Sequence, residues 1–339
     1  MLLGALSSVG TSAAACQVAS RHVRTMNANL PPQGLLDQPA RFLLPAVGGY
    51  RHDTARGLVE VRGLDAVDFL QRVCSQDVAA LEPGAAAPTA FLSNKGKLVA
   101  TAVAIRIEDG ILLDTAASHL ALLGELCERY HFSEKLRITR REGIAVVERV
   151  GGGDDLPTSP WHAVLGHDEL RLVLSRGGLT RERVFAPATR AATQFAELPS
   201  LESWRAECVR IGSGEIEVGR DTDERTLVLE AGLDDHVSTA KGCYVGQEIV
   251  ARIHTYGHLN RRLVRLALAT TAPVADGTEL FDVELGEAVG RVTSACAVHG
   301  TEWSLALGYL PDAFLASPSP LALGMSGGPA VHHADLLPA

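Results

Sequence analysis

The sequence contains KGCYVGQEIVAR, Lys241 to Arg252, and this stretch is its most distinctive feature. Two glycines four residues apart, Gly242 and Gly246, bracket a cysteine, and helix-forming residues follow the second glycine. This pattern predicts a tight turn that enters a helix. Cys243 is then expected just before a helix N-terminus and two residues from Lys241. The positive end of the helix dipole and the charge of the ammonium group both favour thiolate over thiol.

A cysteine thiolate of this kind can attack an electrophile, bind a metal or sense oxidation. On the first turn of the predicted helix, Gln247 and Glu248 are placed to hydrogen-bond the polar edge of a ligand, and Arg252 can grip a carboxylate with two bonds. A simpler interpretation stays open. In it, Cys243 is a buried thiol, Lys241 and Glu248 form a surface pair, and the glycines only serve a turn.

The chain upstream has the pattern of a mixed α+β fold. In order, we expect a strand over Gly57–Arg62, a helix over Ala66–Cys74 capped by Asp65, a hairpin of Thr89–Ser93 and Leu98–Ile107 with its tip at Asn94–Lys97, a strand over Ile111–Asp114, a helix over Ser118–Tyr130, an inserted loop over 151–160, a strand over Leu170–Leu174 and a helix over Leu201–Ile211.

From Arg262 onward the pattern changes to short strands separated by glycine turns. These strands are expected over Leu263–Leu268, Gly277–Phe281, Gly286–Thr293 and Ser304–Tyr309. Such a series is typical of a small β-barrel. Residues 317–339 are expected to complete the barrel and then fray.

Composition and charge argue against several classes of protein. An apolar fraction of 46% and a charged fraction of 21% are typical of globular domains, and 339 residues are enough for two or three of them. The net charge of -9 disfavours nucleic-acid binding over the whole surface, although Arg261, Arg262 and Arg265 form a local basic cluster. No apolar run approaches the roughly 20 residues that span a bilayer. We expect no stable nucleic-acid partner and no membrane anchor.

The six cysteines are scattered, with no C-x-x-C pair and no histidine at metal-ligand spacing; they are Cys16, Cys74, Cys127, Cys208, Cys243 and Cys296. This distribution argues against a disulfide scaffold and against a tightly bound metal. It fits a reducing compartment.

The first 36 residues contain no Asp or Glu and are rich in Ala and Ser. This is the composition of an organelle transit peptide, but the Ala, Gly and Leu bias of the chain and Met26 favour an overextended start or a disordered leader. We therefore expect a leader over residues 1–45 and a cytoplasmic protein, with the mitochondrial matrix as the alternative.

KGCYVGQE resembles the signature of the YgfZ-type folate-binding proteins, K-G-C-[FY]-x-G-Q-E, and matches it at every fixed position. The resemblance covers about residues 50–310. Its further motifs are Gly63–Leu70 with Asp77, the hairpin tip Asn94–Lys97, Glu230–Leu233 and Val289–Ala295.

The resemblance implies the α+β, three-domain cloverleaf of the glycine-cleavage T-protein, with a small C-terminal β-barrel and a folate-sized central cavity. We assign residues 46–255 to two interleaved α+β domains and 256–339 to the barrel. It also implies a monomer that binds tetrahydrofolate or a one-carbon derivative. By this resemblance Cys243 and Lys241 are the reactive pair at the rim of the cavity, and the residues expected to bind the cofactor are Gly242, Tyr244, Gly246, Gln247, Glu248, Arg252, Asn94 and Lys95.

Within this superfamily, aminomethyltransferases carry an Asp pair after the hairpin glycines and a Glu after an Arg-Leu pair. Here Ala100 and Thr101 occupy the first positions, and Gly212 follows Arg210-Ile211. Neither Ala nor Thr can act as a base at neutral pH. The missing carboxylates argue against aminomethyl transfer. The resemblance to the YgfZ-type proteins implies an accessory factor for iron–sulfur clusters in client enzymes, without conventional turnover.

Two alternatives remain at this point. One is a folate-dependent aminomethyltransferase, one-carbon transferase or demethylase that uses another base. The other is a structural relic with an empty cavity. Trp204 is placed either to stack on a pterin or to pack in the core.

Overall fold

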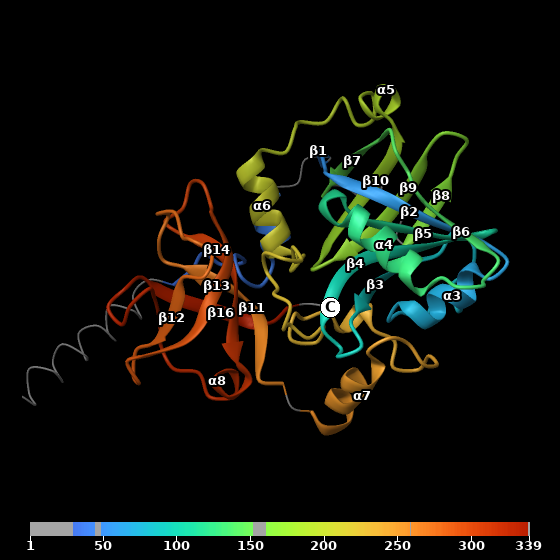
Figure 1. Ribbon diagram of the computed structural model, residues 1–339. Helices are drawn as coiled ribbons and strands as arrows, with labels where there is room; N and C mark the ends of the chain where they lie inside the picture. The colour runs from blue at the N-terminus through green and yellow to red at the C-terminus, as the bar shows by residue number, and fades with distance from the viewer. Residues whose placement is uncertain (1–29, 45–48, 152–160, 258, 338–339) are drawn as a thin grey trace, which may run out of the picture.

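The computed structural model describes residues 30–44, 49–151, 161–257 and 259–337. They form two five-stranded antiparallel sheets and a closed six-stranded barrel. In Figure 1 the barrel lies on one side of the molecule, the two sheets on the other, and α6 (Ser203–Gly212) between them. The expected loop over 151–160 falls almost wholly outside the described residues.

The first sheet has the order β3-β4-β5-β2-β6 and carries two helices. Its strands are β2 (Arg56–Gly63), β3 (Ala86–Leu92), β4 (Leu98–Ile107), β5 (Gly110–Ala116) and β6 (Leu136–Arg140). Because strand side chains alternate, one face of this sheet packs on α3 (Ala66–Val73) and α4 (Leu120–Tyr130), which the 3₁₀ turn η1 (Ala117–His119) precedes. The hairpin, both helices and the expected strands are confirmed.

The second sheet has the order β1-β7-β10-β9-β8. Its strands are β1 (Tyr50–Asp53), β7 (Ile144–Val150), β8 (His162–Leu165), β9 (Leu170–Arg176) and β10 (Leu179–Pro187). The chain leaves this sheet after β1, builds the whole first sheet and returns at β7, so the two sheets are interleaved in sequence. Apolar side chains of both sheets meet face to face, Leu58 and Leu112 from one and Leu172 and Phe185 from the other. The short helix α5 (Ala188–Ala191) packs on β7 and β10.

The barrel closes in the order β11-β14-β13-β12-β15-β16. Its strands are β11 (Arg261–Leu268), β12 (Glu279–Asp282), β13 (Glu287–Ala297), β14 (Ser304–Pro311), β15 (Leu321–Leu323) and β16 (Ala330–Leu336), with α8 (Asp312–Ala316) after β14. The predicted barrel is confirmed, and two strands from the expected tail complete it.

The expected leader over residues 1–45 is wrong for its last part. Leu35 and Leu43 are buried in a core shared with α6 and the barrel, and the helix α2 (Pro39–Leu43) packs on α6. Gly212 lies so close to Pro39 that a Cβ would approach the proline ring to 2.8 Å. The apolar residues of this segment are therefore structural. Residues 1–29 lie outside the described part.

Three smaller findings complete the fold. Asp65 precedes α3 as predicted, but its carboxylate accepts the backbone N–H of Lys135 at 2.6 Å and makes no cap bond to the helix. The five described cysteines are all free. Within the described ranges, no helix is both long enough and apolar enough to cross a bilayer.

Candidate functional site

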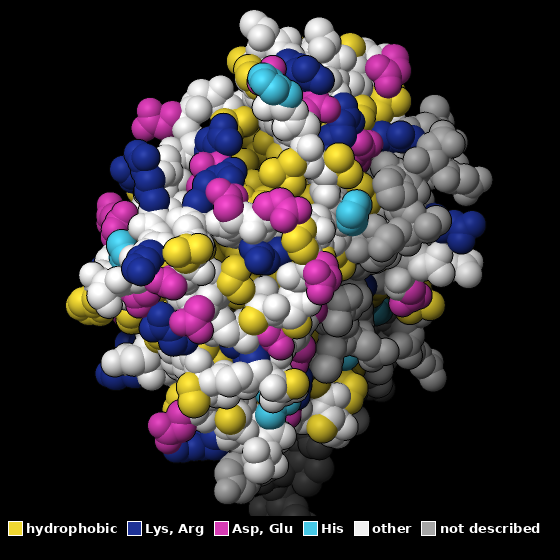
Figure 2. Space-filling model, turned by 90° about the vertical axis from the view of Figure 1, so that its right-hand side faces the viewer, with side chains coloured by type: hydrophobic (Ala, Val, Ile, Leu, Met, Phe, Trp, Pro, Cys, Tyr) yellow, Lys and Arg dark blue, Asp and Glu magenta, His cyan; other side chains and the backbone are white. Residues whose placement is uncertain are grey.

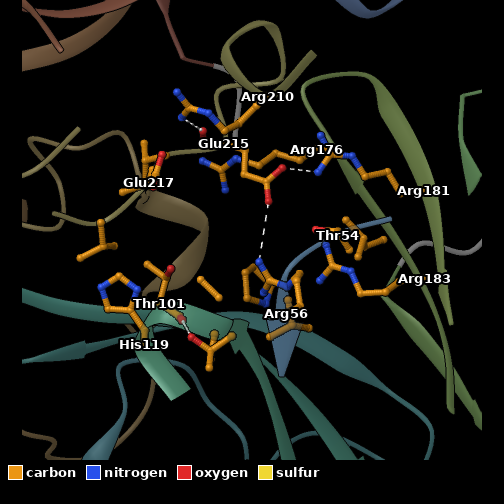
Figure 3. Close-up of a pocket in the computed structure, with 18 of the residues that line it drawn as sticks. Thr54, Arg56, Thr101, His119, Arg176, Arg181, Arg183, Arg210, Glu215 and Glu217 are labelled. Atoms are coloured by element: carbon orange, nitrogen blue, oxygen red, sulfur yellow. Dashed lines mark hydrogen bonds and ion pairs between the residues drawn. The ribbon is translucent and has the colours of Figure 1, made fainter. Parts of the chain in front are cut away.

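A cavity of about 620 Å³ lies where the two α+β sheets meet α6 and the segment after it. This volume is in the range of small-molecule sites. Figure 3 shows Arg56 of β2, Thr101 of β4, Arg181 and Arg183 of β10, and Arg210 of α6 around it. A second cavity of about 320 Å³ shares Arg181, Arg183 and Arg210 with the first, so the two adjoin.

Five arginines line the cavity, and each has a carboxylate partner. Arg183 is buried between the sheets, where it bonds Asp114 of β5 and Glu148 of β7. Burial alone would lower the pKa of Arg183, but these two carboxylates raise it overall. The remaining pairs are Arg56 with Asp114 at 2.7 Å, Arg176 with Asp235 at 2.9 Å, Arg181 with Glu215, and Arg210 with Asp221 at 2.7 Å and Glu207 at 2.8 Å. The cationic wall is thus neutralised from within the protein.

Glu215 lines this space between two arginines. Its carboxylate bonds Arg181 on one side and lies 4.0 Å from Arg56 on the other, as the dashed lines of Figure 3 show. Burial would raise the pKa of Glu215, but Arg181, Arg56 and Arg183 hold it well below the usual range. Glu215 is therefore ionised and engaged at neutral pH, which makes it a poor base.

The positions that decide between branches of the superfamily can now be placed. Thr101 lines the cavity, whereas Ala100, on the opposite face of β4, is fully buried in the helix-covered core. The hydroxyl of Thr115 donates to the Thr101 carbonyl at 2.9 Å. Gly212 ends α6 against Pro39. Among the described residues, the carboxylates on the lining are Glu207, Glu215 and Glu217, and each pairs with an arginine.

The signature loop lies elsewhere. It packs on the β3–β4 hairpin, where a Cβ on Gly246 would come within 2.5 Å of the Ser93 carbonyl and one on Gly96 within 2.8 Å of Ile249. Gly246 has a φ of 81° and precedes α7 (Gln247–Tyr256), so the predicted turn into a helix is confirmed. Figure 1 shows α7 below the sheets, next to this hairpin.

Lys241 does not point toward Cys243. Its buried ammonium donates to the carbonyls of Cys74 at 2.9 Å and Gln76 at 2.7 Å, and lies 5.1 Å from the centre of the Tyr244 ring. Burial lowers the pKa of Lys241. The expectation that this lysine activates the neighbouring thiol stays a prediction, and the bonds of the ammonium group to these two carbonyls give it no support. Lys241 instead fixes the segment that follows α3.

The other predicted site residues do not line the cavity. Cys243 is exposed, and Glu248 and Arg252 form a surface pair at 3.1 Å. The remaining predicted residues share this location outside the cavity; they are Gly242, Tyr244, Gly246, Gln247, Asn94 and Lys95. None of these residues is on the lining of this cavity, and their role toward a ligand stays a prediction.

The loop nevertheless connects to the cavity through Ser75 and Gln76. The Ser75 hydroxyl donates to the His236 carbonyl at 2.6 Å, and the Gln76 side chain donates to the Asp235 carbonyl at 3.0 Å. Lys241 holds the same segment from the other side. His236, in the 3₁₀ turn η2 (Asp234–His236), lines the cavity.

Sequence reasoning missed the residues of the cavity wall. One signal was present, since Arg181 and Arg183 lie on the same face of their strand as the apolar Leu179 and Phe185. The basic cluster expected on β11 disperses: Arg261 pairs with Glu230, Arg262 with Asp312, and Arg265 donates to the Gly212 carbonyl. Figure 2 likewise shows acidic and basic side chains interspersed over the face it presents. Trp204 stacks on His299 at 4.2 Å and packs in the core shared with the barrel.

Among solved structures, the chain is similar to aminomethyltransferase T of the glycine cleavage system from Bartonella henselae. The TM-score is 0.75 at 18% identity, with 90% of each chain covered. The chain therefore has the fold of the glycine-cleavage T-protein, with interleaved sheets and a terminal barrel.

Curated relatives narrow this class. The chain is 27% identical over 278 residues to a putative chloroplastic transferase of Arabidopsis thaliana, covering 75% of this chain and 63% of that relative. It is 27% identical over 265 residues to the tRNA-modifying protein YgfZ of Sodalis glossinidius, covering 73% and 80%. It is 24% identical over 313 residues to a mitochondrial iron-sulfur cluster assembly factor IBA57 homolog of Neosartorya fischeri, covering 81% and 70%. No protein-family model matches the chain. These relatives support the resemblance of the chain to the YgfZ-type proteins.

Proposed function

We propose that the chain binds tetrahydrofolate or a one-carbon derivative in the central cavity and serves as an accessory factor for the assembly or repair of iron–sulfur clusters. One observation carries this proposal. The cavity has the volume for a ligand, and every carboxylate on the described lining pairs with an arginine. By the resemblance, Thr101 on this lining replaces a carboxylate of the transferases.

The composition of the wall supports a folate. Tetrahydrofolate joins a heterocycle with several N–H groups to a tail that ends in carboxylates. The cavity offers both kinds of surface, since Arg56 and Arg210 line it and so do the apolar side chains of Val103 and Leu174. Both guanidinium groups already pair with carboxylates of the protein, so a carboxylate of the ligand would share them.

The carboxylates of the same wall provide no free base for aminomethyl transfer. A general base must be unprotonated and within reach of the proton that it removes. Glu207 and Glu215 are ionised but spend their oxygens on arginines, and Thr101 cannot take a proton at neutral pH. The tRNA-modifying and cluster-assembly relatives favour the accessory role over the transferase alternative.

The signature loop would then act on a partner and not on the folate. Cys243 is exposed outside the cavity, so its thiol can reach a client's cluster or cysteine. One cysteine cannot hold a four-thiolate cluster, and in the part of the chain that the structure describes no group of three metal-binding side chains gathers. Contact with a client's cluster would therefore be transient, with the client or the assembly machinery supplying the other ligands.

Purified protein tests the folate part. Saturating tetrahydrofolate should raise the melting temperature, because a ligand selective for the folded state stabilises it. No methylene- or aminomethyl-tetrahydrofolate should be consumed in steady state. Turnover would favour the transferase alternative, and the absence of any shift would favour the relic with an empty cavity.

The cluster part needs cells. In a bacterial strain that lacks its own YgfZ-type protein, the wild-type chain should restore the activity of iron–sulfur enzymes under oxidative stress. Cys243→Ser should not. Equal restoration by the variant, at equal protein level, would remove Cys243 from the mechanism.

A further inference from the structure

His236 and Asp235 form a fixed pair at the wall of the central cavity. The Nδ1 atom of His236 lies 2.7 Å from Oδ1 of Asp235. An ionised carboxylate only accepts hydrogen bonds, so Nδ1 must carry the proton. The other ring nitrogen, Nε2, is then left with a free lone pair.

The carboxylate of Asp235 is ionised for a clear reason. Burial would raise the pKa of Asp235, but the hydrogen bond with His236 and the charge of Arg176 lower it overall. Arg176 also donates to the carbonyls of Gly214 and Gly232, both at 3.3 Å, which fixes the guanidinium in place. The tautomer of His236 is thus set by a partner that cannot turn away.

The backbone of the pair is held equally firmly. The carbonyls of Asp235 and His236 accept bonds from Gln76 and Ser75, and Lys241 holds Gln76 in turn. The imidazole therefore has little freedom to rotate. Its side chain is only 10% exposed, yet His236 lines the cavity, and in the described ranges Nε2 has no protein partner.

The electrostatics keep this ring neutral. The charged groups facing it are Asp235 on its own turn, Arg176 on β9, and Glu215 after α6. Burial lowers the pKa of His236 although Asp235 opposes this. At neutral pH the ring is a neutral acceptor among guanidinium donors and carboxylates already paired with arginines.

We propose that Nε2 of His236 accepts a hydrogen bond from an N–H group of the ligand in the central cavity, and so selects a heterocycle with an unalkylated N–H, such as a reduced pterin. The identification of the ligand as tetrahydrofolate rests on the proposed function. The acceptor role rests on the geometry of the Asp235–His236 pair.

The test is calorimetric titration of the full chain with tetrahydrofolate. His236→Phe keeps an aromatic ring without the acceptor and should weaken binding about tenfold to a hundredfold, as for a buried donor left unpaired. A matched control is available. His167 also bonds a neighbouring carboxylate, Asp168, at 2.7 Å, but it is 97% exposed and outside this cavity. His167→Phe should bind within twofold of the wild type.

A measurement on the wild type covers the case in which His236→Phe does not fold. Long-range ¹H–¹⁵N spectra should show His236 as the Nδ1–H tautomer, with an Nε2 resonance that moves on saturation with tetrahydrofolate. If His236→Phe binds tetrahydrofolate as tightly as the wild type, or if the Nε2 resonance does not move, the inference is overturned and the proposed function still stands. A wild type that binds no tetrahydrofolate overturns both.

Discussion

Replacing Lys241 with methionine tests whether the signature lysine is an anchor or an activator. Methionine keeps the unbranched apolar chain but removes the donors to the Cys74 and Gln76 carbonyls. Each hydrogen bond from a charged group contributes about 1.5 to 3 kcal/mol, and burial of the ammonium offsets part of that. Lys241→Met should therefore lower the free energy of unfolding by about 3 kcal/mol.

The assay is equilibrium unfolding in urea, with Lys95→Met as the control, because Lys95 is exposed at the tip of the β3–β4 hairpin. The control should change the free energy of unfolding by less than about 0.5 kcal/mol. Lys241→Met should also weaken tetrahydrofolate binding, because it loosens the segment that holds Asp235 and His236. Alkylation of Cys243 by iodoacetamide should change less than twofold. A stable variant with a much slower thiol would refute this reasoning and restore the activator role.

Substitutions of Glu215, Gly246 and Cys243 test the cavity wall and the position of the signature loop. Glu215→Gln should lower the free energy of unfolding by about 2 kcal/mol at pH 7. Because the pKa of Glu215 in the folded protein lies below its ordinary value of 4.5, the carboxylate stabilises the fold above that pH and stabilises it less as the pH falls further. The difference in unfolding free energy between variant and wild type should therefore shrink toward pH 3. Gly246→Ala should lower the free energy of unfolding by roughly 2 to 3 kcal/mol, because its φ is positive and a Cβ would clash with the Ser93 carbonyl. Gly242→Ala should lower it far less, because the space around Gly242 is open. Equal losses of stability in the two variants would contradict the packing of the loop on the β3–β4 hairpin. Cys243→Ser should leave stability and folate affinity unchanged while cluster rescue is lost, and a fall in folate affinity would place the loop at the cavity after all.

Local signals in the sequence were enough for the loop, the hairpin and the barrel. Gly246 before a run of helix formers, and Asn94-Lys-Gly-Lys97 between two apolar strands, encode their conformations within a few residues. The spacing of glycine turns after Arg262 likewise fixes short antiparallel strands.

The site itself could not be predicted in this way. The direction of Lys241 depends on the position of Cys74 and Gln76, some 165 residues earlier, and not on its distance along the chain from Cys243. The buried position of Arg183 depends on carboxylates from β5 and β7, and that of Arg181 depends on Glu215, which follows α6. Leu35 and Leu43 are part of the core only because α6 and the barrel come to lie against them.

We propose that the cavity between the two sheets and α6 holds a tetrahydrofolate, and a crystal structure of the full chain with tetrahydrofolate tests this most directly. The pterin should lie inside the cavity lined by Thr101 and Arg56, with an N–H group within hydrogen-bond distance of Nε2 of His236. Tetrahydrofolate bound at the signature loop, or a cavity empty at saturating ligand, would contradict it.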